Sequence, residues 1–373
     1  MALMNIGILT MYYSNISHGG LLQAYSLCHF LRLHGYEHTE QISYDYNYRF
    51  RLGTVISKVK RAIRKAPYNV FLVITKDKTK ELYNSFMQEI PHSGYYSPDT
   101  IQSIAKEYDC FIVGSDQVWN MSYCDSSYYL PFVANNKKIT YAASVGKDRL
   151  EQGELKQLCD AVKSFYAVSV REKSLKTLLE SMDIRETEHV CDPVFLMDRS
   201  FWEEQSKEVK INDKYTLVYL LSGSRKEKNH ALKLARRTGN KIVVVPNVNL
   251  NMSLFDLCLD AHKAYSVGPR EFIGLIKNAD FVITDSFHCV AFSLIMNVSF
   301  YAISRMGNDF GMDSRIHSIL DSVGLKDRFL TFESREMQIE KVDFGSVNER
   351  IEQLAGNSQK WLLQKIHAIE KPY

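Results

Sequence analysis

The segment around residue 284, where an apolar strand turns directly into a helix, constrains the fold of this chain most. Residues 280–283 have the composition of a short buried strand, and residues 289–296 form an apolar run too long for a second strand. Between them lie Asp285, Ser286 and His288. Such a junction places polar groups at the carboxyl edge of a parallel sheet, beside helix N–H groups that favour anions. The alternative is that Ser286 only caps the helix and His288 packs in its first turn.

Strand-like and helix-like segments alternate along the 373 residues, which favours an α/β protein with parallel sheets. The alternation breaks down at a charged stretch, and a second alternating set follows it. We therefore predict a first domain at 1–200, a linker at 201–214, a second domain at 215–345 and a C-terminal helix at 346–373, with a cleft between the domains. The strands are expected at 5–11, 40–46, 110–113, 139–143, 167–170, 216–221, 242–245, 280–283 and 300–303, and the helices at 21–31, 172–179, 225–238, 269–278, 315–323 and 347–369.

Composition argues against several classes of protein. The formal charge of +3 is close to balance, so a general affinity for nucleic acid is not indicated. The seven cysteines include no C-x-x-C pair, which favours reduced core residues in a reducing compartment over a zinc site. The N-terminal residues lack the features of a signal peptide, and the longest near-apolar run, at 290–303, is too short to span a bilayer. We therefore expect a cytoplasmic protein that needs no metal.

One segment departs from the alternating order. Residues 55–65 place apolar residues at helical spacing and five cations on the remaining face. A basic amphipathic helix of this kind can lie on an anionic membrane surface. The alternative is a solvated helix packed on its own domain. The segment thus leaves open a peripheral contact with the inner face of the membrane.

Polar residues also follow apolar strands in the first half of the chain. The strand expected at 110–113 leads into Ser115, Asp116 and Trp119. Asp116 could orient a sugar hydroxyl or act as a base, and Trp119 could stack on a sugar ring; the alternative is a tight turn with a buried tryptophan. Gly19 and Gly20, before the first helix, permit a close approach of the backbone, although they lack the spacing of a phosphate-binding motif.

Three arginines stand at similar junctions. Arg171 ends a strand and opens a helix, where it can meet a phosphate or carboxylate with two parallel hydrogen bonds. An ion pair with a neighbouring acid is the alternative. Arg305 follows the strand after the His288 helix, and Asn308 and Arg315 come soon after it. Four junctions, two in each half, would gather Asp116, Arg171, His288 and Arg305 in one cleft.

Taken in order, these motifs resemble those of the polysaccharide pyruvyl transferase family. The matching stretches cover most of the chain and are His18-Gly19-Gly20-Leu21-Leu22-Gln23-Ala24-Tyr25, Gly114-Ser115-Asp116-Gln117-Val118-Trp119-Asn120, Ser169-Val170-Arg171-Glu172-Lys173-Ser174, Asp192-Pro193-Val194 and Thr284-Asp285-Ser286-Phe287-His288. Some members have an arginine two places before the histidine, and this chain has Ser286 there. Arg305 or Arg315 could supply the missing anion contact.

The resemblance implies two Rossmann-like domains facing across a cleft, as in B-type glycosyltransferases. It also implies transfer of pyruvate from phosphoenolpyruvate to hydroxyls of a sugar or lipid-linked oligosaccharide, with phosphate released and a ketal formed. His288 would be the general acid, since histidine titrates near neutral pH, and Asp116 the base. Arg171, Arg305, Ser286, Asn308 and Arg315 would bind substrate, with Gly19, Gly20, Ser115 and Trp119.

Two other functions fit the same architecture. A nucleotide-sugar glycosyltransferase would use the same two-domain scaffold, but it needs a base and ribose pocket that the sequence does not indicate. A carbohydrate-binding protein without turnover is the second, and Ser286 in place of the arginine favours that alternative. The sequence predicts the pyruvyl transferase first.

Overall fold

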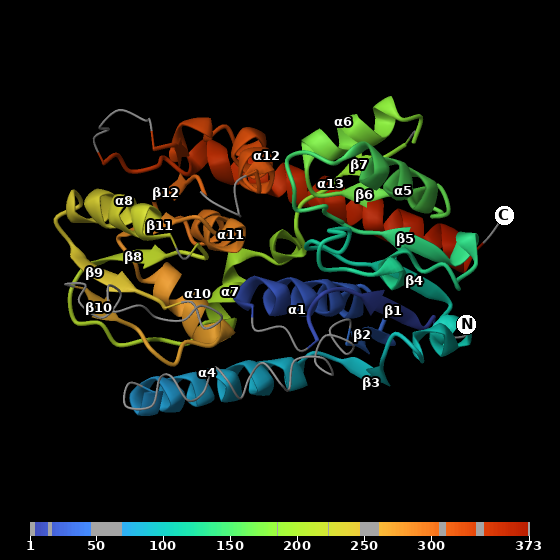
Figure 1. The fold of residues 1–373 in the computed structure, drawn as a ribbon, viewed down its shortest axis with the longest axis horizontal. Coiled ribbons are helices and arrows are strands. Elements are labelled where there is room, and N and C mark those ends of the chain that lie inside the picture. Colours follow the sequence, from blue (N-terminus) through green and yellow to red (C-terminus); the bar gives the residue numbers. More distant parts are fainter. Residues whose placement is uncertain are drawn as a thin grey trace.

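Two parallel sheets lie side by side and form two domains (Figure 1). The computed structural model describes residues 4–13, 17–45, 69–184, 186–222, 224–246, 261–305, 311–332 and 339–371, and the side chains of 69–77 are outside this description. The first sheet has the strand order β3-β2-β1-β4-β5 and the second the order β10-β9-β8-β11-β12-β13. All described pairs within these sheets are parallel. The predicted α/β class, with two Rossmann-like domains, is confirmed.

The first domain covers its sheet with helices on both faces. Its strands are β1 Ile6–Leu9, β2 Thr39–Tyr44, β3 His92–Tyr96, β4 Cys110–Val113 and β5 Lys138–Thr140, with the short pair β6 Ser169–Val170 and β7 Glu188–His189 beside β5. Its helices are α1 His18–Leu33, α4 Asn69–Glu89, α5 Gln152–Val162 and α6 Lys173–Ser181, with 3-10 turns at Ile101–Lys106, Ser126–Tyr129 and Asn135–Lys137. The β1 and β4 strands are completely buried, as central strands of a parallel sheet require.

The second domain repeats this architecture. Its strands are β8 Tyr215–Tyr219, β9 Lys241–Val244, β10 His262–Lys263, β11 Phe281–Thr284, β12 Phe300–Ile303 and β13 Phe329–Leu330. Its helices are α8 Arg225–Arg236, α10 Pro269–Lys277, α11 Phe287–Ile295 and α12 Ser314–Val323, with a 3-10 turn at Lys326–Arg328. Every residue of α11 is buried, which explains why this helix has no polar face in the sequence.

Two helices and one turn connect the domains. The 3-10 helix η5 Pro193–Leu196 leads into α7 Arg199–Gln205, which Asp198 caps by accepting the Phe201 N–H at 2.8 Å. The expected linker at 201–214 therefore begins in a helix, whose Trp202 is fully buried. The last helix, α13 Gly345–Glu370, runs from α12 back along the first domain (Figure 1). The Ser358 hydroxyl of α13 accepts the Cys191 N–H at 2.9 Å, so the C-terminal helix fastens both domains.

The strand order creates one ligand edge in each domain. In the first sheet, β1 and β4 are neighbours whose connections leave in opposite directions, and Leu9 is paired with Val113 at their carboxyl ends. In the second sheet, β8 and β11 have the same relation, and Tyr219 is paired with Thr284. Open α/β sheets bind ligands at such switch points. The loop that carries Asp116 and the start of α11 stand at these two positions.

Candidate active site

Arg171 is the centre of a buried ion-pair cluster between the domains. It follows β6, is 3% exposed, and places its Nη1 atom 2.7 Å from the Asp192 Oδ2 atom. Its Nη2 atom lies 3.6 Å from the Asp116 Oδ1 atom, and its Nε atom 3.4 Å from the Glu172 Oε1 atom. Its guanidinium also stacks over the Phe287 ring of the second domain, 4.5 Å from the ring centre. Arg171 thus pairs with neighbouring acids, which was the alternative interpretation, and it also contacts the second domain. Its binding of a phosphate or carboxylate stays a prediction.

His288 meets the same cluster from the second domain. Its Nε2 atom lies 3.8 Å from the Asp192 Oδ2 atom that Arg171 also contacts, although its side chain makes no hydrogen bond through Nε2. A Cβ atom added to Gly19 would lie 2.0 Å from the His288 Nδ1 atom. Only glycine allows the first turn of α1 to approach the imidazole this closely. Arg171 and His288 therefore lie close together, as the sequence predicted, and Gly19 packs against the imidazole.

Arg315 brings a second guanidinium to Asp116. It lies in the first turn of α12, is 5% exposed, and places its Nη1 atom 3.9 Å from the Asp116 Oδ1 atom. The Arg315 Nε and Arg171 Nη2 atoms are buried and make no hydrogen bond. Buried charged donors without partners are costly, so native structures rarely keep them unless a ligand or water completes them. Two guanidinium groups with free donors thus face one carboxylate across the domain boundary.

Asp192 lies between Arg171 and His288, and sequence analysis gave it no role. Its Oδ2 atom accepts hydrogen bonds from Arg171 and from the Ser115 hydroxyl, the latter at 2.9 Å, while Oδ1 accepts the Val194 N–H at 3.2 Å. The carboxylate therefore positions Arg171 and approaches His288 as well. The Asp192-Pro193 dipeptide after a strand was the sequence feature that could have indicated a role for Asp192. An aspartate before a proline often caps the turn that follows.

The backbone at Asp116 is strained. Its φ angle of 69° lies in the left-handed region, which a residue with a Cβ adopts at a cost of about 1–2 kcal/mol. The loop is held by hydrogen bonds from the Ser144 N–H to the Asp116 carbonyl and from the Trp119 N–H to the Ser144 carbonyl. Strain of this kind persists where the surroundings over-determine it, and such positions cluster at active sites.

Burial and neighbouring charges shift the pKa values of the cluster residues, in several cases in opposite directions. Burial, together with the nearby Arg171 and Arg305 cations, lowers the pKa of Arg315 to about 10. Burial would raise the pKa of Asp116, but Arg171, His288 and Arg315 outweigh it and hold that pKa below its usual range. Burial lowers the pKa of His288, and Asp192 and Asp116 only partly offset this. Asp116 is therefore ionised and His288 neutral near pH 7. Asp192, Glu172 and Asp116 outweigh burial and raise the pKa of Arg171, so Arg315 is the arginine with less counter-charge.

Several predicted site residues make structural hydrogen bonds. Arg305 donates from Nε and Nη2 to the Asp285 carbonyl at 3.1 and 2.9 Å, so it supports the β11–α11 turn. Ser286 caps α11, with its Oγ atom accepting the Cys289 N–H at 3.4 Å. Gly20 donates its N–H to the Ser17 cap of α1 at 3.2 Å. Asn308 and the segment 55–65 are outside the described residues.

The predicted stacking role of Trp119 is wrong for this conformation. Its ring is 1% exposed and stacks on Tyr129 in the core of the first domain, with their centres 6.2 Å apart. A ring with so little exposed surface offers no face to a sugar. The turn with a buried tryptophan, which was the alternative interpretation, describes this residue.

The family assignment follows from a comparison with known families. The model of the polysaccharide pyruvyl transferase family matches residues 18–306, which is more than half of the chain. The chain belongs to this family. It is therefore a transferase, and the resemblance noted in its motifs is confirmed. No curated protein sequence matches the chain.

Solved structures with the same fold are distant in sequence. A putative UDP-N-acetylglucosamine 2-epimerase from Listeria monocytogenes is 9% identical, with 100% of this chain and 98% of that chain covered and a TM-score of 0.55. Anabaena Alr3699/HepE in complex with UDP and glucose is 10% identical, with coverages of 98% and 100% and a TM-score of 0.53. The UDP-GlcNAc 2-epimerase of Methanocaldococcus jannaschii is 13% identical, with coverages of 97% and 99% and a TM-score of 0.53. At these identities the likeness shows the fold alone.

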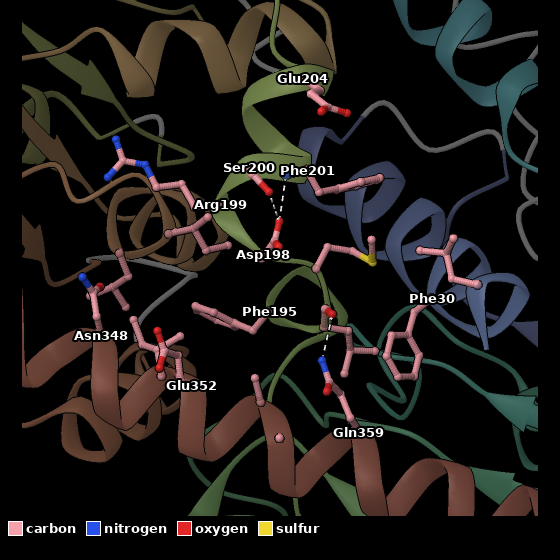
Figure 2. Close-up of a pocket in the computed structure, with 18 of the residues that line it drawn as sticks. Phe30, Phe195, Asp198, Arg199, Ser200, Phe201, Glu204, Asn348, Glu352 and Gln359 are labelled. Carbon is pink, nitrogen blue, oxygen red and sulfur yellow. Dashed lines mark hydrogen bonds between the residues drawn. The ribbon is translucent and has the colours of Figure 1, made fainter.

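A separate pocket lies at the end of α1 opposite to Gly19. It has a volume of about 730 Å³ and is lined by residues of α1, α7, α11 and α13. Figure 2 shows Phe30 of α1, Phe201 of α7 and Glu352 of α13 facing this space. Phe30 is near the end of α1 opposite to Gly19, and a helix of 16 residues is about 24 Å long. This pocket is therefore distinct from the transferase site.

Two further properties concern metals and membranes. Among the residues that the structure describes, no group of three or more His, Cys, Asp or Glu side chains could hold a metal ion. No helix in the described ranges is both long and apolar enough to cross a bilayer.

His18 is a functional candidate that sequence analysis quoted only within a motif. It is 3% exposed, stacks on Phe272 with ring centres 4.4 Å apart, and shares a 2.8 Å hydrogen bond between Nδ1 and the Tyr83 hydroxyl. Burial, aided by His288, lowers the pKa of His18 to about 3. Tyr83 comes from α4, whose helix the sequence analysis did not predict.

The buried His18 should make the protein sensitive to acid. Its pKa is about 6.5 in an unfolded chain and about 3 in the fold, so the unfolded state binds the proton more readily. Its contribution is complete above about pH 6.5 and is lost as the pH falls towards 3. The free energy of unfolding of the wild type should fall when the pH is lowered from 6.5 to 5. In His18→Gln we expect this fall to be smaller by about 2 kcal/mol.

Urea unfolding of both proteins at the two pH values measures this difference. His367→Gln is the matched control, because the His367 side chain is 59% exposed. If the free energy of unfolding fell as much in His18→Gln as in the wild type, His18 would be protonated as easily in the folded as in the unfolded chain.

Proposed function

We propose that this transferase moves pyruvate from phosphoenolpyruvate onto two hydroxyls of a sugar in a cell-surface polysaccharide precursor, free or lipid-linked, and releases phosphate. The observation that carries the proposal is the pair Arg171 and Arg315. They come from different domains, lie 3.6 and 3.9 Å from one Asp116 oxygen, and keep buried N–H groups without hydrogen-bond partners. A small ligand with several negative charges would complete both.

Phosphoenolpyruvate has acceptors for the guanidinium N–H groups that make no hydrogen bond in this cluster. Its carboxylate and phosphate can each accept two parallel hydrogen bonds from a guanidinium group. The first turns of α1 and α11 add backbone N–H groups and a favourable helix dipole. Arg315 is better placed than Arg305 to replace the arginine that some members have at Ser286, since Arg305 is bound to the Asp285 carbonyl.

His288 is proposed as the general acid, although its pKa is lowered in the free protein by burial. A bound phosphate dianion would raise that pKa again, since a nearby negative charge favours the imidazolium. The imidazolium then protonates the CH₂ carbon of the donor, which becomes the methyl group. Positive charge develops on the carbon that bears the phosphate, so this carbon becomes the electrophile.

Asp116 is proposed as the base, which its ionised state at neutral pH supports. It accepts the proton of the attacking sugar hydroxyl, and a carbon–oxygen bond forms. The bond from this carbon to the phosphate oxygen then breaks, and a neighbouring hydroxyl closes the ketal. The two sugar hydroxyls lose two protons in this reaction. One replaces the proton that the enzyme gave to the CH₂ carbon, and the other leaves with phosphate.

The loop after β8 gives little support to the nucleotide-sugar alternative. The Leu221 and Ser222 N–H groups already donate to the Asp285 carboxylate at 2.7 and 2.9 Å. The Ser222 hydroxyl donates to Glu227, which is fully buried in the first turn of α8. A diphosphate placed here would displace or repel these two acids. The described part of this loop is thus occupied by the protein's own carboxylates.

A direct comparison of donors tests the proposal. Purified protein is incubated with phosphoenolpyruvate or with UDP-sugars, and both the melting temperature and the release of phosphate with a sugar panel are measured. We expect phosphoenolpyruvate to raise the melting temperature and to release phosphate only when an acceptor is present. Stabilisation by UDP-sugars but not by phosphoenolpyruvate would reject the proposal.

A further inference from the structure

A cavity of about 720 Å³ lies between the domains, next to the ion-pair cluster. One wall is the loop after β4, with Asn120 and Tyr123, and the other includes Asp313 and His317 at the start of α12. Asn120 is four residues beyond Asp116, and Asp313 is two residues before Arg315. The cavity therefore borders the same two segments that bring Arg315 to Asp116.

Contacts across the domain boundary fix the shape of this cavity. The Asp148 Oδ1 atom of the first domain accepts the Ser314 N–H at 2.8 Å, and the Asp148 N–H donates to the Gly311 carbonyl at 2.6 Å. These bonds bring the rims of the two walls together. The cavity is thus formed by both domains.

Asp313 lines this cavity and has an unsatisfied acceptor. It is 7% exposed, and its Oδ2 atom accepts the Ser304 hydroxyl at 2.9 Å. Its Oδ1 atom is buried and has no hydrogen-bond partner. Such an orphaned acceptor costs about 1–3 kcal/mol unless a ligand or water satisfies it. A sugar hydroxyl is a suitable donor to this atom.

Tyr123 provides an apolar surface at the edge of the same cavity. Its side chain is 49% exposed, although large aromatic side chains are usually mostly buried. The ring can cover the face of a sugar while its hydroxyl remains in water. A cavity of about 720 Å³ is in the range of sites for drug-sized ligands, which are larger than one hexose.

We infer that this cavity binds the neutral sugar unit next to the one that receives pyruvate, so the enzyme requires an oligosaccharide rather than a monosaccharide acceptor. Asp313 accepts a hydroxyl of this second unit, and Tyr123 covers its face. The inference rests on the proposed function, because it assumes that the ion-pair cluster next to the cavity is the reacting centre.

The test compares disaccharides with the corresponding methyl monosaccharides of glucose, galactose, mannose and their N-acetylated forms. For the disaccharide that reacts best, we expect kcat/KM for phosphate release to exceed that of its monosaccharide by at least tenfold. Tyr123→Ala should bring this ratio close to one. Tyr166→Ala is the matched control, because Tyr166 is similarly exposed at 47% but lies outside the cavity. A ratio near one in the wild type, or a ratio unchanged in Tyr123→Ala, would overturn the inference.

Asp313→Ala adds a readout that separates binding from folding. If Asp313 serves a ligand, this variant should lose the preference for the disaccharide and keep the melting temperature within a few degrees. A large fall in melting temperature with the preference intact would show a structural role and contradict the inference.

Two measurements distinguish failure of this inference from failure of the proposed function. The shift in melting temperature caused by phosphoenolpyruvate reports on the donor site and should be the same in wild type and Tyr123→Ala. Saturation-transfer NMR with the same sugars reports on the cavity even if no donor releases phosphate. Disaccharide signals that disappear in Tyr123→Ala would support the cavity assignment in that case, and their persistence would reject it.

Discussion

Replacing His288 with asparagine is expected to lower the rate of phosphate release from phosphoenolpyruvate by about 10²- to 10⁴-fold, the range that a positioned acid or base contributes. The imidazole lies 3.8 Å from the Asp192 carboxylate, which is part of the ion-pair cluster. Asparagine is smaller than histidine, so it fits beneath Gly19 without displacing α1.

Single-turnover release of phosphate measures this effect, and the pH profile gives a second readout. Because an acid must be protonated to act, the wild-type rate should fall as the pH rises through the pKa of His288 in the donor complex. The asparagine variant should lose this dependence. The control is His367→Asn, because His367 is exposed. His317→Asn is unsuitable as a control, because His317 borders the cavity between the domains. Unchanged release in His288→Asn would remove this residue from the acid role.

Arg171→Lys is expected to weaken binding of phosphoenolpyruvate by about 10- to 100-fold, or about 1.4–2.8 kcal/mol. Lysine keeps the positive charge, but one ammonium cannot contact Asp192, Glu172 and a bound anion together as the planar guanidinium does. Titration calorimetry with phosphoenolpyruvate alone measures the loss, independently of the acceptor.

Arg171→Ala should also lower the free energy of unfolding by about 3–5 kcal/mol, because it leaves buried carboxylates without a partner. This makes the lysine variant the better test of binding. Arg199→Ala is the matched control, since Arg199 pairs with Glu203 on the surface and such pairs contribute about 0–1 kcal/mol. Donor affinity that is unchanged in Arg171→Lys would show that Arg171 only stabilises the domain interface.

The order of strands and helices followed from local patterns. The expected strands at 110–113 and 300–303 coincide with β4 and β12, because continuous apolar runs between polar clusters are typical of strands buried in parallel sheets. The expected helix at 269–278 is α10, which begins at Pro269 as the first-turn preference of proline predicts. Helix α4 was missed, although it carries Tyr83 against His18.

The convergence of Arg171 and His288 could be predicted because both follow strands, and the carboxyl ends of parallel strands share one edge. The role of Asp192 could not, since its partners Ser115 and Arg171 are 77 and 21 residues away. Asp192 was overlooked as a site residue, whereas Trp119 was assigned to the site although its ring is buried against Tyr129. The assignment of Trp119 rested on its position shortly after Asp116. Side-chain direction in a turn depends on the backbone geometry of that turn.

Short-range information in the chain thus established the α/β class, the two halves and the polar junctions at their strand ends. Periodicity and turn preference act over a few residues and are legible without the fold. The contact of Arg315 with Asp116 and the cavity at Asp313 arose only when the two domains packed together, and Asp192 took its central position when the first domain folded. These features depend on contacts between residues far apart in the sequence and on burial of charge, which no local pattern encodes.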